Sequence, residues 1–381
     1  MTRLLIALAL AAAPQLASAQ ASLLQSRLQA RLDSLHAAGR FAGAQVGVAL
    51  PDGSTIAVAT GMADTARRER MTTSHLLLQG SVGKTYVSAV ALQLVHEGKI
   101  TLDEKVATYL GDEAWFAGLP NGQDITIRQL MNHTSGLVRY EFNERFTADL
   151  SAAPDRVWQP RELVAYILNT APPFAAGQGW DYSDTNYIVL GIIMEKVMGR
   201  PYLQMLRERI LGPAGLRATA PSEGRVISGL ANGYAGANNP FGGSDAMLVD
   251  GQMVINPQFE WTGGGVASTA EDLARWGKYL YDGKAFDASL MPQLLDGVPA
   301  RLGQGTRYGL GVILRETVVG PVRGHSGFFP GYQAELLYLP QQKVAIAFQV
   351  NSSVPGALGR GMSPGRFAIE LAGIVAESLV R

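Results

Sequence analysis

The sequence predicts an α+β fold, in which an antiparallel sheet is flanked by helices and carries an inserted, mostly helical subdomain. β-Prone runs occur near both ends of the chain, whereas the middle shows helical patterning that Gly and Pro interrupt. Hydrophobic residues make up 47% and charged residues 17% of the 381 residues, as in folded globular proteins. We therefore expect the two terminal parts of the chain to build one sheet together.

The first residues have the layout of a secretory signal peptide. Arg3 supplies a positive start, residues 4–13 form a short apolar run, and Ala17-Ser18-Ala19 offers a small-residue cleavage site. We expect cleavage near Ala19; an uncleaved anchor or a buried N-terminal helix is the alternative. The apolar run is short for a transmembrane helix, and no later segment reaches that length without charges. The sequence thus predicts a periplasmic or secreted protein without a stable membrane span.

Each further element is predicted from its hydrophobic period and from the turn or capping residues at its ends. In chain order they are a helix over 23–35, hairpin strands over 44–50 and 55–59, helices over 86–97, 127–132, 160–169 and 187–198, a helix from a capping box at Ser268–Glu271 to Tyr281, strands over 308–314, 318–323, 332–339 and 344–350, and a helix over 363–379. Gly98 is expected to cap the helix over 86–97.

These elements predict a division of the chain into three parts. Residues 1–19 form the signal peptide, residues 20–105 and 266–381 the sheet domain, and residues 106–265 the helical subdomain. The stretch 229–265 is dense in Gly, Asn and Pro and has little periodicity. A loop of this length usually wraps or carries a site, so we expect the active site where the two domains meet.

Composition excludes several classes of function. The chain has no Cys, which removes disulfides, thiolate catalysis and Cys-based metal sites. Its formal net charge is zero, which gives no indication of nucleic-acid binding. The five His residues are scattered and show no zinc-type spacing. We predict neither a cofactor nor a metal site.

Ser81 and Lys84 form the first chemical motif. Residues three apart at the start of a helix share a face, so the lysine amine can reach the serine hydroxyl and take its proton. The helix N-terminus also directs backbone N–H groups toward a developing oxyanion. Gly83-Lys84-Thr85 resembles the end of a phosphate-binding loop, but Leu78 stands where that loop requires Gly. Nucleotide hydrolysis remains an alternative on this pattern alone.

Two later segments supply candidate partners for Ser81. A phenol held near an ammonium, such as that of Tyr182 in Tyr182-Ser183-Asp184, can act as a proton shuttle, although Ser183 or Asp184 could also simply cap the following helix. His325-Ser326-Gly327 precedes a predicted strand. Gly327 permits close backbone approach, and the N–H of Phe328 can complete an oxyanion hole.

Together these three motifs resemble the serine β-lactamase and penicillin-binding-protein superfamily, in its class C β-lactamase and D-Ala-D-Ala carboxypeptidase branch. The resemblance extends from about residue 25 to residue 380. Four stretches support it: Gln129-Leu130-Met131-Asn132-His133-Thr134-Ser135-Gly136-Leu137, Tyr182-Ser183-Asp184-Thr185-Asn186-Tyr187, Gly265-Val266-Ala267-Ser268-Thr269-Ala270-Glu271-Asp272-Leu273 and Gly324-His325-Ser326-Gly327-Phe328-Phe329-Pro330-Gly331-Tyr332.

The resemblance implies an acyl-enzyme mechanism. Ser81 is then the acylated nucleophile, Lys84 its proton acceptor and Tyr182 the proton shuttle, while His325 stands where β-lactamases have Lys. Ser81 and Phe328 would supply the oxyanion N–H groups. We expect Asp184, Ser326, Gly327, Phe328 and Arg323 to bind the substrate.

Two departures from the family pattern bear on the substrate. Asp184 stands where the family often has Asn, so its carboxylate should favour the ammonium form of Lys84. His325 replaces Lys, which makes the charge for a substrate carboxylate dependent on pH. Arg323 lies two residues earlier on the same strand face and is expected to supply that charge instead.

These features predict an exported serine hydrolase, first a D-Ala-D-Ala carboxypeptidase-like peptidase or amidase. An esterase or a weak class C-like β-lactamase is the alternative within this class. A catalytically silent binder of peptidoglycan fragments is the alternative outside it. The expected partner is a small peptide, amide or ester, of which peptidoglycan is one source.

Overall fold

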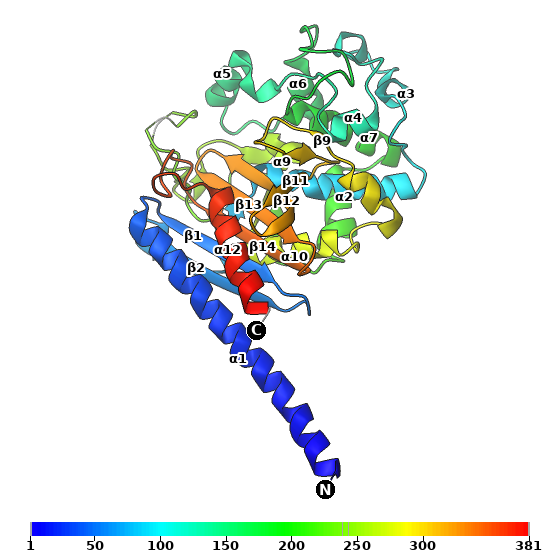
Figure 1. Cartoon of the computed structure of the whole chain (residues 1–381). Coiled ribbons are helices and arrows are strands. Elements are labelled where there is room, and N and C mark those ends of the chain that lie inside the picture. Colours follow the sequence, from blue (N-terminus) through cyan, green and yellow to red (C-terminus); the bar gives the residue numbers. More distant parts are fainter. Residues whose placement is uncertain (1, 238, 243, 380–381) are drawn as a thin grey trace.

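The computed structural model describes residues 2–379 apart from 238 and 243, and it describes residues 2–19 by their backbone alone. Its centre is a nine-stranded antiparallel sheet with the strand order β3-β2-β1-β14-β13-β12-β11-β10-β9 (Figure 1). The strands are β1 (Gly43–Ala49), β2 (Thr55–Asp64), β3 (Glu69–Arg70), β9 (Val298–Pro299), β10 (Arg307–Tyr308), β11 (Ile313–Thr317), β12 (Gly320–Phe329), β13 (Tyr332–Leu339) and β14 (Val344–Val350).

The two ends of the chain meet in the middle of this sheet. β1 pairs with β14 in the register Ala44↔Val350, and β1 pairs with β2 as the predicted hairpin. The expectation of one sheet from both terminal parts is therefore confirmed. All nine strands lie outside residues 106–265, while the exact domain boundaries stay a prediction.

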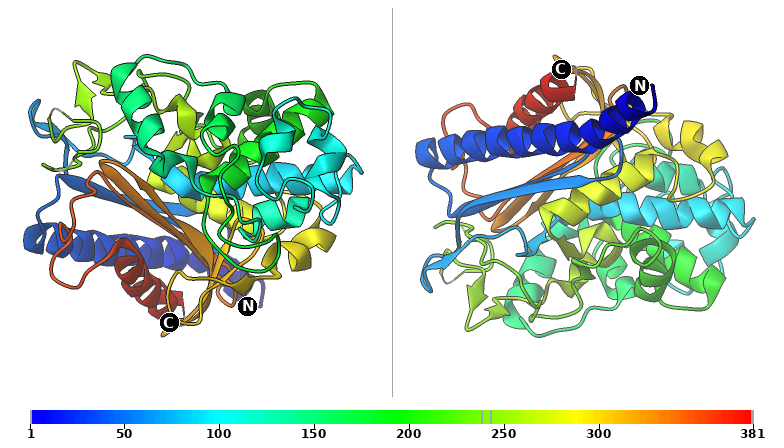
Figure 2. Two further views of the ribbon diagram at one scale, coloured as in Figure 1. Left: turned by 90° about the horizontal axis from the view of Figure 1, so that it is seen from above. Right: turned by 90° about the horizontal axis from the view of Figure 1, so that it is seen from below.

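Helices cover both faces of the sheet. On one face, α12 (Pro364–Leu379) and the part of α1 (Thr2–Ala38) from Leu24 onward pack against it. On the other lie α10 (Ala270–Tyr281) and α2 (Lys84–His96) (Figure 2). Leu336 and Leu337 of β13 belong to different cores, as the alternation of side chains along a strand requires. Apolar burial thus fixes the sheet between two helical layers.

The region between the sheet segments is mostly helical and lies beside the sheet (Figure 1). Its helices are α3 (Val106–Leu110), α4 (Ile127–Met131), α5 (Glu144–Ala152), α6 (Pro160–Ala165), α7 (Asp184–Met198), α8 (Tyr202–Leu206) and α9 (Trp261–Gly264); α11 (Met291–Leu295) follows α10. Two small sheets lie outside the large one: β4 (Leu77–Leu78), β8 (Val266–Ser268) and β5 (Thr219–Pro221) form one, and β6 (Leu248–Val249) and β7 (Gln252–Met253) the other.

Several predicted elements differ in detail from the structure. The predicted capping box has Ser268 as the N-cap, but α10 begins one residue later, with Thr269 as its N-cap. The Thr269 hydroxyl accepts from the backbone N–H of Asp272, whereas the Ser268 hydroxyl donates to the Thr269 carbonyl. The predicted strand over 308–314 is split into β10 and β11, because Gly311 takes a φ of 80° between them. The predicted strand over 318–323 continues to Phe329, so His325 lies within β12.

The signal peptide expected at residues 1–19 remains a prediction. The backbone of residues 2–19 continues the helix α1, and the side chains of the proposed signal peptide lie outside the described part of the chain. Among the described helices, none combines the length and the apolar character that crossing a bilayer requires.

Candidate active site

Ser81 and Lys84 lie together where β4 gives way to α2. A short 3-10 turn over Gly80–Gly83 carries Ser81 directly into the helix that Lys84 begins. Lys84 Nζ donates a hydrogen bond of 2.9 Å to Ser81 Oγ. The local spacing therefore places a hydroxyl and an amine in direct contact, as the sequence predicted.

Lys84 is fully buried and makes two further hydrogen bonds, to the Asp184 carboxylate and to the Gly263 carbonyl. Burial is the largest single effect and would lower the pKa of Lys84, but the charge and hydrogen bond of Asp184, together with Tyr182, raise that pKa above its usual value. Asp184 is the first residue of α7, and Lys84 in turn holds the pKa of its carboxyl low against the effect of burial. Lys84 is thus an ammonium in the resting enzyme.

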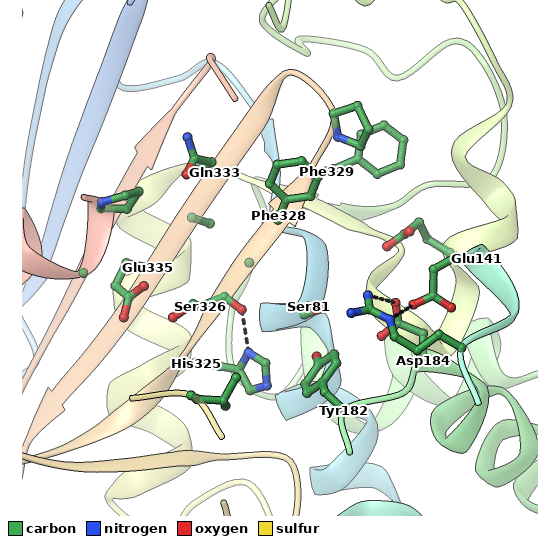
Figure 3. Close-up of a pocket in the computed structure, with 18 of the residues that line it drawn as sticks. Ser81, Glu141, Tyr182, Asp184, His325, Ser326, Phe328, Phe329, Gln333 and Glu335 are labelled. Carbon is green, nitrogen blue, oxygen red and sulfur yellow. Dashed lines mark hydrogen bonds and ion pairs between the residues drawn. The ribbon is translucent and has the colours of Figure 1, made fainter. Parts of the chain in front are cut away.

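The Tyr182 ring lies beside this ion pair. Lys84 Nζ is 5.0 Å from the centre of the ring. The His325 ring lies on another side of Tyr182, with the ring centres 6.3 Å apart (Figure 3). Burial raises the pKa of Tyr182, and the positive charge of Lys84 opposes that rise. Within the described residues, the buried Tyr182 hydroxyl has no hydrogen-bond partner. The phenol is therefore a neutral proton donor with a free hydroxyl at the site.

His325 is brought to the site but carries no charge. Its Nδ1 donates to the Ser326 carbonyl at 2.6 Å, so its Nε2 accepts from the Tyr308 hydroxyl at 2.8 Å. Burial, assisted by the nearby Lys84 charge, lowers the pKa of His325 to about 3. The expected pH-dependent charge of His325 is therefore absent near neutral pH, because the buried ring is held as one neutral tautomer.

Arg323 does not line the cavity that contains Ser81. It pairs in register with Tyr338 of β13. Burial raises the pKa of the Tyr281 and Tyr338 phenols, and the positive charge of Arg323 partly opposes this rise, so Arg323 lies near these two tyrosines. Residues two apart on a strand share a face but are about 7 Å apart along it, which takes Arg323 past the site. The expectation that Arg323 meets the substrate is therefore not met.

Arg315 of β11 lines the cavity instead. It donates to the buried Glu335 carboxylate at 2.8 Å and to Ser326 Oγ at 3.1 Å. Sequence reasoning missed Arg315, because its position depends on the pairing of β11 with β12. This pairing sets Arg315 opposite Val322, on the strand face that also carries Ser326, and the long side chain then reaches Ser326.

Glycines allow two backbone segments to meet at Ser81. Gly80 has a φ of +49°, and a Cβ there would lie 2.4 Å from the Phe328 carbonyl oxygen. A Cβ on Gly327 would lie 1.8 Å from the Gln79 carbonyl oxygen. The sequence predicted a close approach at Gly327, and in the structure the approaching group is the chain before Ser81. The segment carrying Ser81 and the strand carrying Phe328 therefore touch through their backbones, as an oxyanion hole shared between them requires.

Gly327→Ala is expected to slow covalent labelling of Ser81 by at least about 100-fold, the cost of misplacing one oxyanion donor. The added Cβ forces β12 away from Gln79. Labelling rates with a fluorophosphonate probe measure the effect. Gly224→Ala, at a position where a Cβ meets nothing within 4 Å, is the matched control and should label normally. Equal labelling of both variants contradicts the argument.

The site opens into a cavity of about 980 Å³. Its wall joins the polar groups above to a large aromatic surface (Figure 3). The phenylalanines of this surface are Phe142, Phe146, Phe241, Phe259, Phe328 and Phe329. Among the residues that the structure describes, no group of three or more His, Asp or Glu side chains is arranged to hold a metal ion. The cavity is large enough for a substrate with a bulky apolar side chain.

Two further carboxyls, those of Glu141 and Glu260, line the cavity near Asp184. Arg139 pairs with Glu141 at 2.6 Å and approaches Asp184 to 3.9 Å. Burial and the Asp184 charge raise the pKa of Glu141 and bring that of Glu260 to about 8. Sequence reasoning missed Arg139, Glu141 and Glu260, because no local pattern indicates that these residues lie near Asp184.

The fold and the Ser–Lys–Tyr site define a member of the serine β-lactamase and penicillin-binding-protein superfamily. A family model described as Beta-lactamase matches residues 28–369, and the chain belongs to this family.

Similar proteins of known name include penicillin-binding proteins and D-aminopeptidases. The chain is 28% identical over 295 residues to "Penicillin-binding protein 4*" of Bacillus subtilis, which covers 75% of this chain and 63% of that protein. It is 27% identical over 297 residues to the D-aminopeptidase of Brucella anthropi, covering 77% of this chain and 53% of that protein. The chain thus spans between about half and two thirds of the length of these relatives.

Among solved structures, the D-amino acid amidase of Ochrobactrum anthropi SV3 in complex with L-phenylalanine amide is similar over nearly its whole length. The TM-score is 0.78 with 25% sequence identity, and the match covers 93% of this chain and 98% of that chain.

Proposed function

We propose that the protein is a serine amidase or aminopeptidase that forms an acyl-enzyme on Ser81 and acts on substrates with a free ammonium group near the scissile amide. The observation that carries this proposal is a charge imbalance beside the nucleophile. Three carboxyls, of Asp184, Glu141 and Glu260, face two cations, Lys84 and Arg139.

The imbalance favours a cationic substrate. With two cations for three carboxyls, ionisation of all three is unfavourable, which agrees with the raised pKa of Glu141 and with the pKa of about 8 for Glu260. A substrate ammonium would supply the missing positive charge and allow the third carboxyl to ionise. The names of the D-aminopeptidase and D-amino acid amidase relatives agree with substrates of this kind.

The proposed chemistry accounts for each proton. As Ser81 Oγ attacks the amide carbonyl carbon, its proton passes to Lys84 while Lys84 gives one of its own to Asp184. Tyr182 donates its phenolic proton to the leaving nitrogen and recovers a proton from Lys84, which regains one from Asp184. Water then attacks the Ser81 ester by the same path in reverse, and the acid product leaves.

A second candidate, a D-Ala-D-Ala carboxypeptidase, is favoured by Arg315. Its guanidinium lines the cavity beside Ser326 and could receive a C-terminal carboxylate. Against it, Arg315 is already bound to the buried Glu335, and His325 is neutral. Esterase and weak β-lactamase activity follow in that order, since Asp184 gives penicillin-like substrates no amide donor.

A turnover screen with purified protein tests these assignments. It compares D-phenylalanine amide and its N-acetyl derivative with a D-Ala-D-Ala peptide, a short acyl ester and a chromogenic cephalosporin. We expect the free-amine amide to be the preferred substrate. Preference for the N-acetylated or D-Ala-D-Ala substrate would overturn the proposal, and absence of both turnover and Ser81 labelling would indicate a silent binder of peptidoglycan fragments.

Glu141→Gln is expected to raise KM for D-phenylalanine amide by about 10- to 100-fold, because a charged hydrogen bond to the substrate ammonium is lost. KM for the N-acetyl derivative should change little, since it has no ammonium group. Glu144→Gln, an exposed glutamate three residues later, is the matched control. Steady-state kinetics check the result, and equal losses on both substrates would exclude ammonium binding by Glu141.

We also propose that the protein is exported after cleavage near Ala19. The charged start, short apolar run and small-residue site of residues 1–19 support this. N-terminal sequencing of the protein from culture medium or periplasm checks it, and an intact Met1 in that fraction would contradict it.

A further inference from the structure

We propose that His133 is a positioning residue for Tyr182, which it holds in place by binding the chain on both sides of that tyrosine. The inference rests on the proposed function, in which Tyr182 transfers protons. It gives a role to the stretch around Asn132-His133-Thr134, which has no part in the chemistry described above.

His133 binds both neighbours of Tyr182. Its carbonyl oxygen accepts from the Asp181 N–H at 3.1 Å, and its Nδ1 accepts from the Ser183 N–H at 3.3 Å. Its ring lies against the Tyr182 ring, with the centres 4.2 Å apart and the planes at 39°. One residue therefore fixes the backbone before and after the tyrosine as well as its ring.

The Tyr182 side chain depends on these contacts. Within the described residues its buried hydroxyl makes no hydrogen bond of regular geometry, although Lys84 and Ser81 are near enough to oppose the rise that burial causes in its pKa. The direction of the hydroxyl toward Lys84 and Ser81 must come from the backbone and from the rings around it. His133 supplies the backbone bonds, and its ring is nearer to Tyr182 than those of Trp180, Tyr308 and His325.

His133 is held in one state for this role. Its Nδ1 also accepts from the Asn186 side-chain amide at 2.9 Å, so the ring proton is on Nε2. The ring is fully buried, and burial lowers the pKa of His133 well below its usual value. It is therefore neutral, and Nδ1 stays available as an acceptor at neutral pH.

The backbone of His133 is unusual for a residue with a side chain. Its φ is +64°, in the left-handed region that side chains disfavour. In this conformation its carbonyl and its ring nitrogen both meet the Tyr182 segment. Packing alone would not require this geometry, since an aromatic ring of similar size could fill the space between Tyr187 and Tyr308.

Two substitutions separate the contributions of His133. His133→Phe keeps a ring but loses the acceptor. His133→Asn loses the ring but tolerates the left-handed conformation and offers Oδ1 to the Ser183 N–H. His96→Asn, at an exposed position at the end of α2, is the matched control.

The first measurement is the turnover of D-phenylalanine amide. We expect His133→Phe to lower kcat about 10- to 100-fold with KM within about twofold, and His133→Asn to recover part of the loss. Added to Tyr182→Phe, His133→Phe should cost almost nothing further, because it acts through Tyr182. Independent, multiplying losses would overturn the proposal.

The second measurement does not need activity. In protein labelled with 3-fluorotyrosine, the Tyr182 signal is the ¹⁹F resonance that Tyr182→Phe removes. His133→Phe should shift or broaden this signal, while those of the distant Tyr109 and Tyr279 report that the fold is intact. An unchanged Tyr182 signal refutes the role of His133, even if the wild-type protein turns over none of the substrates and the proposed function fails.

Discussion

Ser81→Ala is expected to abolish covalent labelling and to lower turnover by about 10⁴- to 10⁶-fold, as in other serine hydrolases without their nucleophile. Ser81 Oγ is the hydroxyl that accepts from Lys84 Nζ at 2.9 Å. The Ser326 hydroxyl in the same cavity is instead bound by Arg315. Removal of the Ser81 oxygen therefore removes the one group placed to form the acyl-enzyme.

Labelling with a fluorophosphonate, followed by mass spectrometry of the modified peptide, measures this effect. Ser363→Ala is the matched control, because this exposed serine lines the outer part of the cavity. The control should still be labelled at Ser81. A Ser81→Ala protein that keeps its melting temperature and its label would place the nucleophile elsewhere and end the proposed mechanism.

Lys84→Met is expected to remove activity and to destabilise the fold by about 3–5 kcal/mol, the usual cost of breaking a buried ion pair. Lys84 is fully buried and the Asp184 side chain is 10% exposed, so the substitution leaves a carboxylate with little solvent. Urea unfolding measures the stability, and labelling of Ser81 measures the chemistry.

Lys278→Met separates these two effects. Lys278 pairs with Asp282 at 2.8 Å and is mostly buried, but it lies outside the active-site cavity. This variant should lose stability and keep its labelling rate. If Lys84→Met labels as fast as Lys278→Met, Lys84 is a structural cation and takes no part in catalysis.

The stability lost in Lys84→Met should depend on pH with a definite sign. Lys84 lowers the pKa of Asp184 below its unfolded value of about 3.9, so the contribution of that carboxylate is present above this pH and is lost as the pH falls. Asp184 raises the pKa of Lys84, whose contribution is present below about pH 10.4 and is lost at higher pH. The difference from wild type should therefore be large at pH 7 and smaller near pH 3.

Local patterns alone predicted much of the fold. The hairpin of β1 and β2, the strands β13 and β14, and α2 with its Gly98 cap follow from apolar period and turn residues, which act over a few positions of the chain. The contact of Ser81 with Lys84 was predictable for the same reason, because a helical turn brings residues three apart onto one face.

Contacts between distant segments were only partly predictable. The motifs around Tyr182 and His325 indicated which residues meet Ser81, and the structure brings both to the site. The neutral state of His325 was not predictable, because it depends on burial and on the hydroxyl of Tyr308 from another strand.

The family, the order of most elements and the contact of Ser81 with Lys84 followed from the sequence alone. The tertiary structure decided the charges that surround them. Arg315 and Arg323 lie at nearly the same level of the sheet but on opposite faces, and only Arg315 lines the cavity. Packing of the helical region brings Glu141 and Glu260 to Asp184. Electrostatic energy depends on distance and burial in the folded protein, and neither can be obtained from spacing along the chain.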